Sequence, residues 1–213
     1  MRPPRFRVIK EKLGHRIDGW IHTLFPFLFW RPIPPDLLTV TGTVVASAAG
    51  LAFAGGQPRL AGVLLLVGGF FDLVDGVVAR HFGISTRFGA FLDSSLDRVV
   101  DILVMLGLVT FFARRGDSIG IVLCALILVA SVLTSYAKAR AERILERMPG
   151  GLLERGERIG LLALGALVGV LWPILWLLAV GTLVTVGQRF LYAYREMAQL
   201  DRAEREAEDG EAG

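Results

Sequence analysis

The stretch DLVDGVVARHFGISTRFGAFLDSSLD, residues 72–97, places four aspartates where two apolar segments meet. Asp72 and Asp75 are three residues apart near the end of one apolar segment. Asp93 and Asp97 are four residues apart near the start of the next. Both spacings put the two side chains of a pair on one face of a helix. If the two helices form a hairpin, four carboxylates converge at one depth.

The segments on both sides of this stretch are apolar all round and about as long as a bilayer is thick. Of the 213 residues, 54% are hydrophobic and 20% are charged, and most of the charges are clustered. This composition excludes a disordered chain and an ordinary cytosolic enzyme. Cys124 is the single cysteine, which excludes an intramolecular disulfide. We therefore expect an all-α integral membrane protein. Its net charge of +3 indicates membrane topology and no nucleic-acid partner.

Turn signals such as Gly-Gly-Gln-Pro divide the chain into six expected transmembrane helices. These span residues 36–55, 59–81, 88–112, 118–146, 154–171 and 174–198. They form one domain over residues 32–200. Residues 1–31 are expected to be an amphipathic juxtamembrane segment in the headgroup layer, because Pro26 and the short apolar length disfavour a further span. Residues 201–213 form a charged cytoplasmic tail that we expect to fray or to be disordered.

The distribution of Lys and Arg predicts the orientation in the membrane. Six spans place both termini on one side, and 19 of these basic residues fall on that side. Only Arg59, Arg114 and Arg115 fall on the opposite side. The positive-inside rule therefore predicts that both termini and the aspartates face the cytoplasm, in a multi-pass protein of the cell membrane.

Four carboxylates at one depth predict a metal site. In a low dielectric they repel one another, so either some are protonated or a cation neutralises them. The set contains no His or Cys, and hard divalent cations prefer oxygen ligands. We expect Mg²⁺ or Mn²⁺, as a pair of ions, because paired divalent ions suit phosphoryl chemistry. Asp101 lies one turn further on, where we expect it to pair with Arg98 or to support the ligands.

Residues around the aspartates also suit a phosphate ligand. Gly76 follows Asp75 and removes a side chain where a ligand can approach the backbone. Arg80 can pair with a phosphate or a carboxylate, and Thr86 can form a hydrogen bond to a ligand. The rival interpretation is that these intramembrane acids only support packing, but two acid pairs on consecutive helices favour a functional site.

Residues 72–97 follow the pattern D-x2-D-G-x2-A-R-x8-G-x3-D-x3-D at every fixed position. This pattern resembles the signature of the CDP-alcohol phosphatidyltransferase family. The resemblance implies that a CDP-linked lipid gives its phosphatidyl group to an alcohol and that CMP leaves. It implies Asp72, Asp75 and Asp93 as metal ligands, and Asp97 as the general base that also touches metal. It further implies CDP contacts from Gly76, Arg80 and Thr86, and a homodimer.

The acceptor alcohol depends on the later cations. An acceptor that carries its own phosphate needs additional Arg or Lys, and the candidates close to apolar sequence are Lys138, Arg155 and Arg189. SYAKARAE and GLLERGER resemble the prokaryotic phosphatidylinositol-phosphate synthase branch of the family, in which the acceptor is inositol 1-phosphate. IPPDLLTVTG resembles the same branch and implies that Asp36 lies near the nucleotide.

Several alternatives stay open. The donor is CDP-diacylglycerol or an ether-lipid counterpart. Glycerol 3-phosphate is the alternative acceptor, although the Asn and nearby Arg of phosphatidylglycerophosphate synthases are absent from the IPPDLLTVTG stretch. A cation or proton transporter is the rival from another class. It is disfavoured because its polar residues would be spread across the membrane depth rather than gathered at one end.

Overall fold

The structure, a computed structural model, describes residues 34–211, which form six helices and no strand. The expected juxtamembrane segment, residues 1–31, lies outside the described residues. The helices are α2 (Pro35–Ala54), α3 (Pro58–Phe82), α4 (Arg87–Ala113), α5 (Ser118–Ala141), α6 (Arg155–Val168) and α7 (Leu171–Glu211). The all-helical prediction is confirmed for this part of the chain.

Two helix ends differ from the sequence-based expectation. Helix α5 ends at Ala141 rather than 146, because the next residues turn back and pack Leu145 and Met148 against Tyr192 and Met197 of α7. The charged residues after 200 continue α7 to Glu211 rather than fraying. The expectation of disorder there was wrong because Glu, Arg and Ala are all strong helix formers.

Four helices are long and apolar enough to cross a membrane: α2, α3, α5 and α7. Helix α4 has 27 residues but carries Asp93, Asp97, Arg98 and Asp101 around its middle. Helix α6 has 14 residues, fewer than the roughly 20 that a straight crossing needs. The chain is a membrane protein, and its two less apolar helices bring Asp93, Asp97 and Arg155 to the site, where they join the aspartates of α3.

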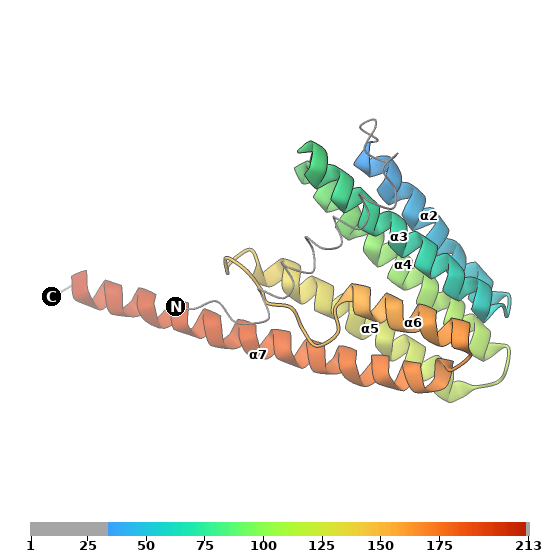
Figure 1. The fold of residues 1–213 in the computed structure, drawn as a ribbon. Helices are drawn as coiled ribbons and strands as arrows, with labels where there is room; N and C mark the ends of the chain where they lie inside the picture. Colours follow the sequence, from blue (N-terminus) through green and yellow to red (C-terminus); the bar gives the residue numbers. More distant parts are fainter. Residues whose placement is uncertain (1–33, 212–213) are drawn as a thin grey trace.

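The helices form two groups of three, α2–α4 and α5–α7 (Figure 1). Within the first group, α2 packs against both α3 and α4, and among the described residues α3 and α4 have few direct contacts with each other. Between the groups, α3 packs on α6 and α4 packs on α5. A core of buried apolar side chains draws on all six helices. Helix α2 therefore fixes the spacing between the two helices that carry the aspartates.

Glycines allow α2 to approach its neighbours closely. A Cβ on Gly107 of α4 would overlap the carbonyl oxygen of Gly50 on α2. A Cβ on Gly42 of α2 would lie 2.8 Å from Phe71 Cβ and 3.1 Å from the Gly68 carbonyl oxygen of α3. Small residues at such crossings let backbones touch, which is how membrane helices commonly pack.

Candidate active site

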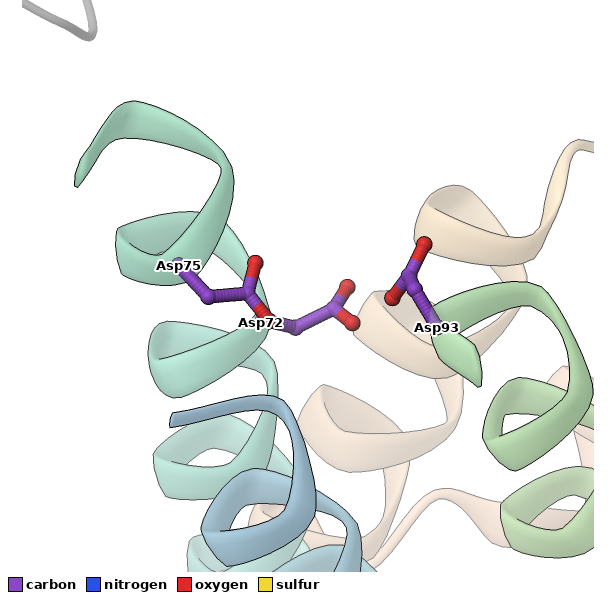
Figure 2. Close-up of side chains that lie close together, drawn as sticks. All are labelled: Asp72, Asp75 and Asp93. Carbon is purple, nitrogen blue, oxygen red and sulfur yellow. The ribbon is translucent and has the colours of Figure 1, made fainter. Parts of the chain in front are cut away.

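Three of the predicted aspartates converge. Asp72 and Asp75 on α3 and Asp93 on α4 each offer one carboxylate oxygen, and these oxygens all lie within 4.8 Å of one another. Figure 2 shows the side chains of the two helices pointing toward one another. Asp75 is buried, whereas Asp72 and Asp93 keep some exposure. The expectation that the acid pairs of consecutive helices meet is confirmed for these three.

A short connection between α3 and α4 brings the aspartates of the two helices together. Gly83 caps the end of α3, and its φ of 63° is the left-handed conformation that glycine adopts without strain. Thr86 caps the start of α4, where its hydroxyl oxygen accepts a hydrogen bond from the Gly89 N–H over 2.8 Å. These caps fix where each helix begins and ends, and therefore which face carries its aspartates.

Asp97 lies one turn beyond Asp93 and is held by an arginine. Arg155 Nη1 is 2.8 Å from Asp97 Oδ1 and 3.3 Å from Asp72 Oδ2. The guanidinium therefore joins α6 to both acid-bearing helices. This places a predicted phosphate-binding cation directly beside the acids.

Helix α7 holds the segment that positions Arg155, the first residue of α6. The Leu152 N–H donates to Gln188 Oε1 over 2.9 Å, and the Leu153 N–H donates to Thr185 Oγ1 over 3.0 Å. The Glu154 N–H donates to Glu157 Oε2 over 2.7 Å, which caps the first turn. The two contacts to α7 were not predicted from the sequence, because they join residues more than 30 positions apart.

Asp101 forms a buried ion pair with a partner that the sequence did not indicate. Arg158 Nη2 lies 3.1 Å from Asp101 Oδ2, and both side chains are buried. Arg155 Nε lies 3.6 Å from Asp101 Oδ1. The expected ion-pair role of Asp101 is confirmed, but Arg98 is not the partner, because it donates to the Ser94 carbonyl of its own helix. Asp101 thus links α4 to α6 behind Asp97.

The residues expected at the nucleotide lie together. Asp36, Gly76, Arg80 and Thr86 all line a cavity of about 180 Å³. Asp75 and Asp93 line the same cavity, so it is continuous with the acid cluster. The hydroxyl oxygen of Thr86 also serves as the cap of α4, a structural role that the sequence did not predict.

A larger cavity of about 560 Å³ is also lined by Gly76 and Arg80. Its lining includes the charged Asp72 and Arg155 as well as apolar side chains such as Leu66 and Leu73. The two cavities share Thr39, Gly76 and Arg80, so one ligand with a polar and an apolar part can occupy both.

Lys138 and Arg189 form no ion pair with these acids. Lys138 is exposed and pairs with Glu142 on the next turn, at 3.9 Å. Arg189 is buried in α7 and donates to the Thr134 carbonyl of α5. Their expected role at an acceptor phosphate therefore stays a prediction.

Thr39 is a site residue that sequence analysis missed. Its hydroxyl donates to Asp75 Oδ2 over 2.5 Å, across from α2 to α3. The signal available in the sequence was its position three residues after Asp36, in the polar run TVTGT of an otherwise apolar segment.

The donor set fits a divalent cation. Three carboxylates from two helices offer only oxygen ligands, which hard cations such as Mg²⁺ and Mn²⁺ prefer. The acids are close enough for one ion to bridge them, and their mutual repulsion in a partly buried site favours a bound cation.

A family model described as CDP-alcohol phosphatidyltransferase matches residues 33–188. A phosphatidylinositol phosphate synthase of Mycobacteroides abscessus is 42% identical over 164 residues, which cover 73% of this chain and 74% of the relative. An archaetidylinositol phosphate synthase of Methanothermobacter thermautotrophicus is 36% identical over 172 residues, covering 78% of this chain and 85% of the relative.

Crystal structures of one similar protein share the fold. The Mycobacterium tuberculosis phosphatidylinositol phosphate synthase with CDP-DAG bound has a TM-score of 0.69 and 32% identity. That match covers 86% of this chain and 94% of the other. The structure of the same synthase in complex with manganese and citrate also has a TM-score of 0.69, with 31% identity, and covers 85% of this chain and 88% of the other.

Proposed function

Because this chain belongs to the CDP-alcohol phosphatidyltransferase family, we propose that it transfers the phosphatidyl group of CDP-diacylglycerol to inositol 1-phosphate and releases CMP. Membership of this family makes the chain an enzyme. The rival interpretation, that the chain is a transporter, is therefore dropped. The observation that carries the proposal is the meeting of three carboxylates with Arg155, which puts a cation site and an anion-binding group side by side.

Asp72, Asp75 and Asp93 are the proposed metal ligands, with Asp97 alongside, for a pair of Mg²⁺ or Mn²⁺ ions. When bound, such ions stabilise negative charge on diphosphate oxygens. Support comes from the 4.8 Å clustering of the ligand oxygens and from the manganese complex of the mycobacterial synthase.

The nucleotide part of the donor is proposed to occupy the smaller cavity, against Asp36, Gly76, Arg80 and Thr86. The apolar side chains that line the larger cavity suit the lipid side of the same molecule. Arg80 lines both cavities and is therefore the proposed partner of the diphosphate that joins the two parts.

Asp97 is the proposed general base. The acceptor hydroxyl oxygen attacks the phosphorus that carries the diacylglycerol, and the bond from that phosphorus to the bridging oxygen breaks, so CMP leaves with the bridging oxygen. The hydroxyl proton passes to Asp97. Since an alcohol is a much weaker acid than a carboxylic acid, the proton moves as the new O–P bond forms. Arg155, 2.8 Å away, orients the carboxylate.

The acceptor phosphate is proposed to bind Arg155, with further positive charge from Lys138 and Arg189. Arginine suits this role because its planar guanidinium can donate two parallel hydrogen bonds to a phosphate. In this proposal Arg155 lies between the base and the acceptor, which ties acceptor binding to the reacting hydroxyl.

The proposed setting is a cell membrane that all six helices cross, with both termini and the site facing the cytoplasm, in a homodimer. The excess of Lys and Arg on one side of the expected spans supports this orientation. Labelling of single cysteines introduced at Gly56 and Gly150, in a Cys124→Ser background, would test it.

A transfer assay tests the function. Purified protein with CDP-diacylglycerol and Mg²⁺ is given inositol 1-phosphate, glycerol 3-phosphate or free inositol, and both CMP and the product lipid are measured. We expect transfer to inositol 1-phosphate and its loss with EDTA. Transfer to glycerol 3-phosphate alone would contradict the proposal and favour phosphatidylglycerophosphate synthase activity. A CDP-linked ether lipid in parallel tests the donor.

A further inference from the structure

Thr39 lies at the contact between α2 and the acid cluster. Its hydroxyl donates to Asp75 Oδ2 over 2.5 Å. Thr39 is 8% exposed and Asp75 is 7% exposed, so this hydrogen bond is shielded from water. A neutral donor is therefore buried against the most buried carboxylate of the three.

The close crossing of α2 and α3 brings the two side chains together. Gly42 is three residues after Thr39, which puts both on the same face of α2. A Cβ on Gly42 would lie 2.8 Å from Phe71 Cβ and 3.6 Å from the Asp72 backbone nitrogen. The helix backbones thus touch one turn away from Thr39.

The other threonines of α2 show that this contact is not the default for a helical threonine. Thr41 donates to the Leu37 carbonyl over 2.7 Å, and Thr43 donates to the Thr39 carbonyl over 2.8 Å. Both bonds stay within α2, four residues back. Thr39 has the equivalent acceptor, the Pro35 carbonyl, at 3.0 Å, yet its hydroxyl lies closer to the Asp75 carboxylate on α3.

We propose that Thr39 is a positioning residue for Asp75. One carboxylate oxygen accepts the hydroxyl, which fixes the rotation of the carboxylate and directs its second oxygen to a divalent cation shared with Asp72 and Asp93. This inference rests on the proposed metal site. Groups that hold a metal ligand through its second atom typically change metal affinity by about 10- to 100-fold when they are removed.

Direct titration with Mn²⁺ tests the inference without any nucleotide or lipid substrate. The full-length protein in detergent is titrated, and free Mn²⁺ is read from its electron paramagnetic resonance signal. The variants are Thr39→Val, which keeps the shape and removes the hydroxyl, and Thr39→Ser, which keeps the hydroxyl. Thr41→Val is the matched control, because it removes a hydroxyl from the exposed side of the same helix.

We expect Thr39→Val to weaken Mn²⁺ binding by roughly tenfold or more, with Thr39→Ser and Thr41→Val close to the wild type. Wild-type affinity in Thr39→Val would overturn the inference. So would normal Mn²⁺ affinity combined with weaker CDP-diacylglycerol binding, because Thr39 would then be a ligand contact. If Thr39→Val does not fold, a weakened affinity in Thr39→Ser would also overturn it, since the hydroxyl is retained.

The titration and the transfer assay fail independently. The wild-type protein could bind Mn²⁺ through Asp75, in a way that depends on Thr39, and yet transfer nothing to inositol 1-phosphate. That result would contradict the proposed function and leave the role of Thr39 intact. A wild type that binds no Mn²⁺ would overturn both.

Discussion

The acids of the site come from two consecutive helices, whereas the cations expected to face them come from three helices of the second half of the chain. The carboxylate oxygens of Asp72, Asp75 and Asp93 meet within 4.8 Å. Of the three cations, Arg155 reaches the acids, Lys138 stays on its own helix and Arg189 is used between α5 and α7. The acids follow from local helical spacing around one short loop, but the cations depend on how separate helices pack.

This difference predicts unequal tolerance to change. The acidic side is set by spacing and by two helix caps, so single acids can be altered without moving their neighbours. The basic side is held by long-range contacts, such as Thr185 and Gln188 of α7 to the segment before Arg155. Changes there should affect position as well as charge.

The largest expected effect is at Asp97. Asp97→Asn keeps the size of the side chain but removes the proton acceptor, so CMP release should fall by roughly 10²- to 10⁴-fold. The measurement is single-turnover CMP release at saturating acceptor, with folding checked by circular dichroism. Asp201→Asn, on the exposed end of α7, is the control. Unchanged CMP release would remove Asp97 from the proposed chemistry.

Arg155→Gln should affect the acidic and the basic side in opposite directions: it should weaken the binding of the acceptor and strengthen the binding of Mn²⁺. Loss of a charged hydrogen-bond donor should raise the KM for inositol 1-phosphate by roughly 10- to 100-fold. Mn²⁺ binding should tighten, because the guanidinium 3.3 Å from Asp72 repels a cation. Transfer kinetics and a metal titration measure the two. A KM that responds to Lys138→Gln and not to Arg155→Gln would instead place the acceptor phosphate near α5.

A smaller effect is expected where α2 crosses α4. Gly107→Ala puts a methyl group against the Gly50 carbonyl, and overpacking of this kind typically destabilises by about 1–3 kcal/mol. Thermal unfolding in detergent should show a lower midpoint. Gly187→Ala on α7 is the matched control, since a Cβ there meets nothing within 4 Å. An unchanged midpoint for Gly107→Ala would show that the crossing is looser than the structure has it.

The smallest effect is expected from charged residues that belong to neither the acidic nor the basic side of the site. Deletion of residues 201–213 removes acidic and basic groups that are exposed along the end of α7. Transfer rate, acceptor KM and Mn²⁺ affinity should all match those of the full chain. A raised acceptor KM would show that the basic side extends further along α7 than Arg189.

Much of the fold follows from the sequence alone. Apolar length, Gly and Pro at the turns and the acid spacing are local properties, and they predict four of the six helices to within a few residues at each end. The charged end of α7 and the early end of α5 were missed. At the end of α5, tertiary contacts outweighed the helix that the composition suggested. At the end of α7, the helix propensities of the residues outweighed the disorder that the charges suggested.

The site divides in the same way. Asp72, Asp75 and Asp93 are predictable because a helix fixes the relation of residues three or four apart. The Thr39–Asp75 hydrogen bond and the Arg158–Asp101 pair join residues 36 and 57 positions apart, so they depend on which helices touch and at what height. No periodicity in a single sequence contains that information.

Helix α7 has a practical consequence. Its 41 residues correspond to a rod of about 60 Å, roughly twice the hydrocarbon thickness of a bilayer, and it extends well past the other helices (Figure 1). A fusion partner whose own first helix continues α7 directly from Glu211 would be held in a defined orientation. A flexible linker would not fix that orientation. Such a chimera would give this small protein a rigid fiducial for single-particle imaging.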